Sequence, residues 1–61
     1  MGRFHVVDED GDIIARYEFG ITADGHAGQL SDLISEKTFL AIDTKDGSVY
    51  GAYRNGLEVK S

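Results

Sequence analysis

Apolar and polar residues alternate most regularly between Asp12 and Ile21, and this alternation predicts a long β-strand. From position 13 to position 21 the odd-numbered residues are all apolar or aromatic, whereas Arg16 and Glu18 lie between them. A period of two is typical of a strand with one buried face. The segment Arg3–Asp8 has similar residues, and the Asp10-Gly11 pair between the two segments is typical of a hairpin turn.

A two-residue Asp10-Gly11 turn fixes the register of this first hairpin. It gives three cross-strand pairs: Asp8 with Ile13, Val6 with Ala15, and Phe4 with Tyr17. These pairs place the apolar side chains of both strands, Phe19 included, on one face. A three-residue loop would place Phe4 opposite Arg16, so the two-residue turn is favoured.

An amphipathic helix of two to three turns is predicted after the glycine-rich stretch 20–28. Leu30, Leu33 and Ile34 have the spacing of one apolar helix face, and we expect the helix to begin between Asp24 and Gly28. So short a helix needs a sheet to pack on. Three more strands are expected after it: Thr38–Asp43, Ser48–Tyr53 and Leu57–Lys60.

The element order β-β-α-β-β-β predicts an α+β fold for a single domain, residues 1–61. It contains an antiparallel sheet of about five strands with one short helix packed on one face. For the last hairpin a three-residue loop ending at Gly56 is favoured, because it pairs Tyr53 with Leu57, whereas a two-residue loop would pair Tyr53 with Glu58. The register around Asp46-Gly47 stays open, because both faces of residues 39–42 are apolar.

The second face of this sheet is not fully polar. Four residues are expected there: Val7, Ile14, Tyr50 and Ala52. Strong curling of the sheet would cover them, and a dimer contact or a partner protein would do so as well. We favour curling over a partner surface.

Composition narrows the function. The chain has 61 residues, a net charge of −5 and no cysteine, so it has no disulfide, thiolate metal site or thiol nucleophile. It has no run of eighteen apolar residues, and residues 1–5 lack the apolar core of a signal peptide. A soluble cytoplasmic protein without a membrane segment is therefore expected.

The charge is unevenly distributed along the chain. Residues 1–36 contain eight acidic and two basic residues, whereas residues 37–61 contain three acidic and four basic ones. An acidic first half argues against direct nucleic-acid binding and is compatible with docking on a basic surface. Ordinary solubilising charge is the alternative interpretation.

A calcium loop is suggested by the alternation of Asp8, Asp10 and Asp12. An EF-hand loop starting at Asp8 would need glycine at position 13 and glutamate at position 19, but the chain has Ile13 and Phe19 there. The three carboxylates would also lie across a tight hairpin and would not converge. No metal site and no cofactor are therefore predicted.

Phosphate binding and catalysis are not supported either. Gly20 and Gly25 have phosphate-loop spacing, but His26 stands where the lysine should be. His5 and His26 have no evident partner for acid–base work, and the serines lack a nucleophile-elbow context. The sequence predicts a protein that is not an enzyme.

The remaining candidate is the surface. Eight carboxylates of the first hairpin and the helix are predicted to form an acidic partner-binding side: Asp8, Glu9, Asp10, Asp12, Glu18, Asp24, Asp32 and Glu36. Carboxylates on a rigid sheet can occupy arginine and lysine pockets that hold phosphates. Tyr50 is a possible aromatic anchor.

In its size, acidity, single-domain character and lack of a catalytic motif, the chain resembles small phage-encoded inhibitors, the anti-CRISPR and DNA-mimic proteins. The resemblance covers the whole chain in general character and assigns a role to no single residue. It implies docking on a basic, nucleic-acid-handling protein of the host cytoplasm and blocking its access to DNA. The alternative is a small interaction domain that self-associates, or docks on a partner, through the apolar sheet face. As a DNA-mimic-type inhibitor, the protein is expected to be a monomer or a weak homodimer.

Overall fold

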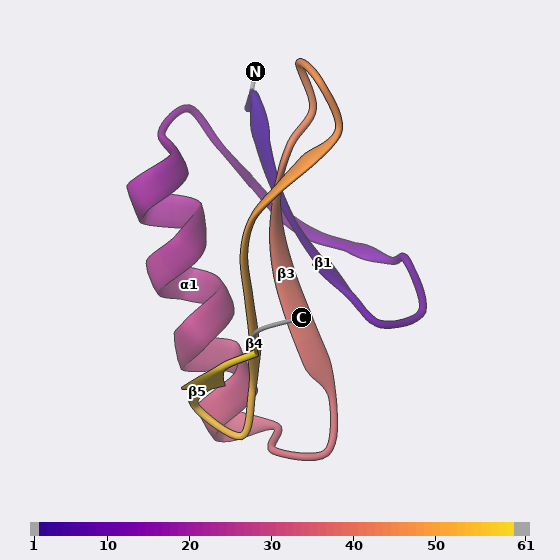
Figure 1. The fold of residues 1–61 in the computed structure, drawn as a ribbon, viewed down its shortest axis with the longest axis vertical. Coiled ribbons are helices and arrows are strands. Elements are labelled where there is room, and N and C mark those ends of the chain that lie inside the picture. Colours follow the sequence, from indigo (N-terminus) through magenta and orange to yellow (C-terminus); the bar gives the residue numbers. More distant parts are fainter. Residues whose placement is uncertain (1, 60–61) are drawn as a thin grey trace.

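In the computed structural model, which describes residues 2–59, one helix packs on one face of a five-stranded antiparallel sheet (Figure 1). The elements in chain order are β1 (Phe4–Asp8), β2 (Ile13–Tyr17), α1 (Gly20–Leu33), β3 (Thr38–Asp43), β4 (Ser48–Arg54) and β5 (Leu57–Glu58). The order of strands in the sheet is β2-β1-β3-β4-β5. The predicted α+β fold, with one helix on an antiparallel sheet, is confirmed.

The centre of the sheet is formed by strands that are distant in sequence. β1 pairs with β3 in unbroken antiparallel register, from Phe4 opposite Asp43 to Asp8 opposite Phe39. α1 lies between these two strands in the chain and crosses one face of the sheet (Figure 1). The fold therefore joins an N-terminal hairpin to a C-terminal β3-β4-β5 meander.

Burial alternates along the two central strands, and this alternation identifies the covered face. Phe4 and Val6 of β1, and Phe39 and Ala41 of β3, are buried together against Ala23 and Ala27 of α1. The residues between them on β1 and β3 are only half-buried. The core thus lies between α1 and one face of the sheet, and the other face has no element covering it within residues 2–59.

α1 is longer than predicted and packs through a different face. It begins at Gly20, before the predicted 24–28 window, and Phe19 precedes it in extended conformation. Small side chains form its buried stripe: Gly20, Ala23, Ala27 and Ser31. Leu30 packs partly on the core, but Leu33 is 72% exposed and Ile34 40% exposed, so the predicted leucine-isoleucine face was wrong.

The reason for this difference is close packing of α1 on the sheet. Gly20 is so near Phe4 and Tyr50 that a Cβ there would lie 2.8 Å from the Tyr50 ring, and a Cβ at Gly28 would touch the Tyr53 ring at 3.6 Å. Glycine lowers helix propensity by about 1 kcal/mol relative to alanine. Tertiary packing therefore outweighs the local preference that suggested a later start.

The first hairpin has the predicted register at the end away from its turn and a different register next to the turn. Phe4 pairs with Tyr17 and Val6 with Ala15, as predicted, but Val7 rather than Asp8 pairs with Ile13. Ile14 is thus the extra residue of a β-bulge, which moves Ile13 to the uncovered face. The turn is longer than two residues, since the N–H of Gly11 bonds to the Asp8 carbonyl and the N–H of Asp8 to the Asp12 carbonyl.

The second strand is shorter than predicted. β2 ends at Tyr17, and Phe19 is 70% exposed beside the start of α1. Ala15 and Tyr17 pack partly on the core, whereas Ile13 is 46% exposed. The core face predicted for Ile13 and Phe19 was therefore wrong.

The last hairpin has the turn that the sequence argument rejected. Arg54 pairs with Leu57 and Tyr53 with Glu58, which leaves a two-residue Asn55-Gly56 turn. Both turn residues have positive φ, 54° at Asn55 and 75° at Gly56, as in a type I′ turn. The intrinsic preference of Asn-Gly for this turn outweighs the cross-strand pairing used to choose the longer loop.

A second bulge answers the register left open around Asp46-Gly47. Ala41 pairs with Gly51 but Ile42 pairs with Val49, so Tyr50 is the extra residue of β4. The Tyr50 ring packs edge-on against Phe4, with 5.6 Å between ring centroids. Tyr50 therefore lies on the α1 side, and its predicted place on the second face was wrong.

Candidate interaction surfaces

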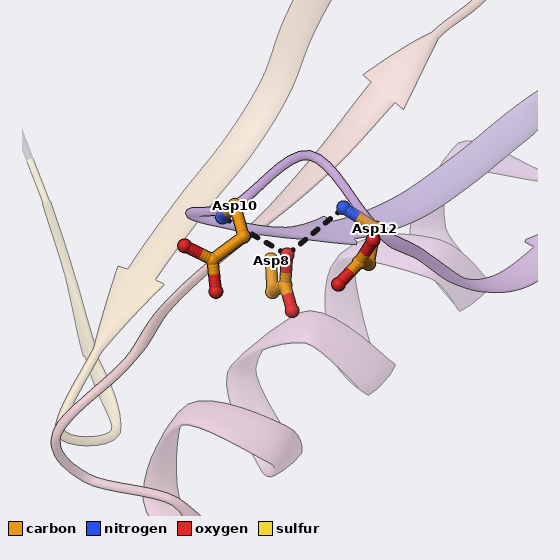
Figure 2. Close-up of side chains that lie close together, drawn as sticks. All are labelled: Asp8, Asp10 and Asp12. Atoms are coloured by element: carbon orange, nitrogen blue, oxygen red, sulfur yellow. Dashed lines mark hydrogen bonds between the residues drawn. The ribbon is translucent and has the colours of Figure 1, made fainter.

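Asp8 shapes the tip of the first hairpin from inside. Its Oδ1 accepts hydrogen bonds from the backbone N–H groups of Asp10, at 3.0 Å, and Asp12, at 2.9 Å (Figure 2). The side chain is only 5% exposed. The N–H groups of Asp12 and Asp10, together with the Lys37 ammonium, hold the pKa of Asp8 below its usual value. The expectation that all carboxylates of this turn are exposed was therefore wrong.

The carboxylates of Asp8, Asp10 and Asp12 converge, contrary to the prediction. One oxygen from each lies within 4.8 Å of the others (Figure 2). The Lys37 ammonium lies 3.6 Å from a carboxylate oxygen of Asp8 and 3.6 Å from one of Asp10. These two carboxylates raise the pKa of Lys37, and its ammonium supplies positive charge to the cluster. The cluster is accordingly explained as a turn whose carboxylates are stabilised by the ammonium of Lys37.

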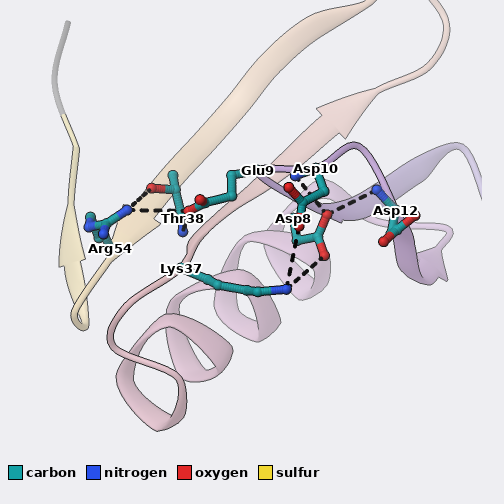
Figure 3. Close-up of polar contacts among 7 residues, drawn as sticks. All are labelled: Asp8, Glu9, Asp10, Asp12, Lys37, Thr38 and Arg54. Atoms are coloured by element: carbon teal, nitrogen blue, oxygen red, sulfur yellow. Dashed lines mark hydrogen bonds and ion pairs between the residues drawn. The ribbon is translucent and has the colours of Figure 1, made fainter.

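Glu9 belongs to a second network on the other side of the same hairpin. Its Oε1 accepts a 2.9 Å hydrogen bond from the N–H of Thr38 and forms a 3.3 Å ion pair with Arg54 (Figure 3). Arg54 also donates to the Thr38 hydroxyl at 3.1 Å. This network joins the tip of the first hairpin to the start of β3 and the end of β4.

The other predicted acidic residues are dispersed over the molecule. Asp24 of α1 accepts a 2.7 Å hydrogen bond from the Tyr53 hydroxyl, which raises the pKa of Tyr53 to about 12. Asp32 lies beside Gly56 at the β4–β5 turn, on the sheet edge away from the first hairpin. Glu18 and Glu36 are exposed in the segments before and after α1. The eight carboxylates are thus distributed over both edges of the sheet.

The charge asymmetry of the two chain halves does not carry over to the fold. Lys37 and Arg54, both from the second half, pair with carboxylates of the first hairpin. In the opposite direction, Arg3 donates two hydrogen bonds, of 2.8 and 2.7 Å, to Asp43. The fold therefore brings the bases of one half against the acids of the other, which sequence position alone does not reveal.

His26 has a partner that sequence reasoning missed. It lies within α1 rather than in a flexible connection, and its Nδ1 shares a 2.8 Å hydrogen bond with the Tyr17 hydroxyl. The two rings also meet edge to face at 5.5 Å. This pair fastens β2 to α1.

The sheet face opposite α1, which we call the open face, is covered by no helix or strand of residues 2–59. Register and alternating burial assign eleven residues to it: His5, Val7, Ile13, Arg16, Thr38, Leu40, Ile42, Val49, Ala52, Arg54 and Leu57. Val59 adjoins it, because the Val59 N–H bonds to the Ala52 carbonyl. Curling of the sheet leaves Val49 55% exposed and Val59 46% exposed, so it does not cover this face as we favoured.

A groove runs along the open face beside β4 and β5. Four aliphatic residues contribute to its lining: Leu40, Val49, Ala52 and Val59. Its volume is about 520 Å³. These aliphatic residues are suited to contact apolar groups, and Tyr50 and Glu58 also line the groove.

Part of the open face was readable from the sequence. Val7 and Ala52 were correctly expected on it, but Leu40, Ile42 and Val49 were not assigned. Their signal is the unbroken apolar run 39–42, which is typical of a strand with apolar neighbours on both faces. The register of β4, which decides the face of Val49, depends on the Tyr50 bulge.

Comparison with known proteins gives no relative: no family model, no curated protein and no solved structure matches this chain. In the part of the chain described, residues 2–59, no helix has the length and apolar character needed to cross a membrane.

Proposed function

We propose that this protein is a non-enzymatic binding domain whose contact surface is the open face. The observation that carries the proposal is a largely aliphatic face that no element of residues 2–59 covers, on a domain whose opposite face already holds the core. Val7, Leu40, Ile42 and Ala52 are half-buried there, and Val49 and Val59 are exposed. Burying such area in a contact contributes roughly 25 cal/mol per Å².

The polar groups near the core support a binding role over a catalytic one. The Tyr53 hydroxyl bonds to Asp24, His26 bonds to Tyr17, and the Ser31 hydroxyl accepts a hydrogen bond from the Gly56 N–H. Each of these contacts fastens one element to another or closes a turn. A catalytic base and nucleophile would instead converge on a cleft that substrate can enter.

Two variants with the same chemical change test this function. Val49→Lys places a charge on the open face, whereas Leu33→Lys makes the same change at an exposed aliphatic residue of α1. We expect proteins captured from lysate of the source cells, further copies of this chain included, to be retained by parent and Leu33→Lys. Val49→Lys should retain at least tenfold less of these proteins than the parent does. Equal retention by both variants would contradict the proposal.

A second function, docking of the acidic side on a basic nucleic-acid-binding site, is favoured by the distribution of charge. The described carboxylates lie on the α1 side of the sheet or in connecting segments, and the pairing of Glu58 with Tyr53 assigns Glu58 to the α1 side as well. Asp32, in α1, and Glu36, in the segment after it, are exposed. In this function the protein would block DNA access, as the anti-CRISPR resemblance implies.

The test of the acidic surface avoids Asp8, because its replacement would disturb the hairpin. Asp32→Lys combined with Glu36→Lys should abolish binding to a basic partner, and added salt should weaken binding of the parent. Val49→Lys serves as the control and should bind normally in the same assay. Salt-independent binding, or full binding by the double variant, would rule out the acidic docking.

A further inference from the structure

We propose that the open face binds the open face of a second copy of this chain, giving a two-fold dimer with both α1 helices on the outside. This inference rests on the proposed function and names the occupant of its contact surface. Sheet-to-sheet packing of this kind buries two apolar faces about 10 Å apart.

An uncharged row of side chains crosses the middle of the open face. Ile13 pairs with Val7, Val7 with Leu40, and Leu40 with Ala52. Val59 extends this row onto the last strand through its bond to Ala52. A two-fold axis along the row places its apolar side chains on one another, so the centre of the contact contains no charge and avoids a large desolvation cost.

The covered face supplies only a small core. Its buried apolar residues are Phe4, Val6 and Phe39 together with three alanines. A chain of about 60 residues folds close to the lower limit of stability, and oligomerisation is one way to add buried area. An occupant that stabilises the fold must be available whenever the protein is made. A second copy satisfies this condition.

The width of the face also selects a sheet as its occupant. Five strands about 4.8 Å apart span roughly 19 Å, whereas a helix is about 10 Å across and would cover only half of this width. Two copies bury on the order of 1,000 Å², which is at the lower end for a specific interface. The dimer is therefore weak and depends on protein concentration.

The charges at the two ends of the face set its orientation. Arg16 lies at one end, beside His5, while Glu9 and Arg54 lie at the other end beside Thr38. Antiparallel superposition brings Arg16 to Glu9 of the second copy. The two α1 helices, which carry Asp24 and Asp32, are separated by two sheets packed about 10 Å apart, and this distance exceeds the Debye length of about 8 Å at physiological salt.

Sedimentation equilibrium between 5 µM and 1 mM tests the dimer. We expect parent and Leu33→Lys to shift from monomer to dimer over this range, and Val49→Lys to associate at least tenfold more weakly. Arg16→Glu should weaken association about threefold, whereas Lys45→Glu, with the same charge change in the β3–β4 connection, should have no effect. Val59→Lys, outside the strands, replaces Val49→Lys if that variant is not folded by circular dichroism.

The outcomes separate this inference from the proposed function. A monomeric parent at 1 mM overturns the dimer. The proposed function then stands if Val49→Lys still loses a different captured protein. Equal association of parent, Val49→Lys and Val59→Lys overturns the open-face dimer, and if capture is unaffected as well the proposed function fails too. Equal effects of Arg16→Glu and Lys45→Glu refute the antiparallel orientation.

Discussion

At the scale of single residues, two aspartates that face α1 are structural anchors. Asp8 and Asp43 are 5% and 8% exposed. Each lies on the covered face of the sheet, Asp8 opposite Phe39 and Asp43 opposite Phe4. Asp8 is satisfied by two backbone N–H groups, and Asp43 by Arg3 and the N–H of Lys45. Buried carboxylates of this kind need such partners, because an unpaired charge in the interior is costly.

The pH dependence of stability should reflect Asp43. The Arg3 guanidinium, followed by the Lys45 N–H, lowers the pKa of Asp43 to about 2. The unfolded value is near 4, so the carboxylate contributes stability above about pH 4 and this contribution is lost as the pH falls to about 2. Urea unfolding midpoints at pH 6, 4, 3 and 2 should therefore drop steeply below pH 4.

Asp43→Asn isolates this effect. The variant should be less stable than the parent at pH 6, and its midpoint should change less between pH 4 and pH 2. The remaining dependence should include Asp8, whose pKa is lowered in the same direction. Parallel profiles for variant and parent would show that Asp43 does not cause the acid sensitivity.

The sequence revealed the composition of the acidic turn but not the direction of its side chains. Asp8, Asp10 and Asp12 were all placed outside because charge usually indicates exposure. Asp8 turns inward because an aspartate can accept bonds from N–H groups two and four residues later. Lys37, which completes the arrangement, is too distant in sequence to be identified as its partner.

At the scale of elements, the strands were predicted better than the helix. Alternating residues and Gly-containing turns mark β1, β3 and β4 directly, whereas the bulges at Ile14 and Tyr50 shift the faces of their neighbours. The helix was misjudged because large apolar residues were taken as its packing face. Its real stripe of glycine, alanine and serine has helical spacing but weak hydrophobicity.

Glycine-to-alanine substitutions in α1 and in the β4–β5 turn should have opposite effects on stability. Gly25 is exposed inside α1 with nothing within 4 Å of an added Cβ, so Gly25→Ala should stabilise the protein by about 0.5–1 kcal/mol. Gly56 has φ of 75°, and Gly56→Ala should destabilise it by about 1–2 kcal/mol. Thermal unfolding of both variants measures the difference. Destabilisation by Gly25→Ala would place residue 25 outside a regular helix.

At the scale of the whole molecule, the two chain halves are interleaved in charge and in packing. Lys37 and Arg54 of the second half form ion pairs with carboxylates of the acidic first half. In packing, α1 of the first half covers strands β3 and β4 of the second. Net charge per segment is readable from the sequence, but its neutralisation depends on which strands become neighbours. The pairing of β1 with β3 decides this, and turn signals do not encode it.

The β1–β3 pairing also shapes how the chain folds. Each hairpin closes over a few residues, but the seam between β1 and β3 joins Phe4 to Asp43 and must close a loop that contains β2 and all of α1. Closing long loops before their contacts form slows folding. The N-terminal hairpin and the β3-β4-β5 meander should therefore assemble early, with the seam forming in the rate-limiting step. Substitutions within the seam should change the folding rate more than those at either sheet edge.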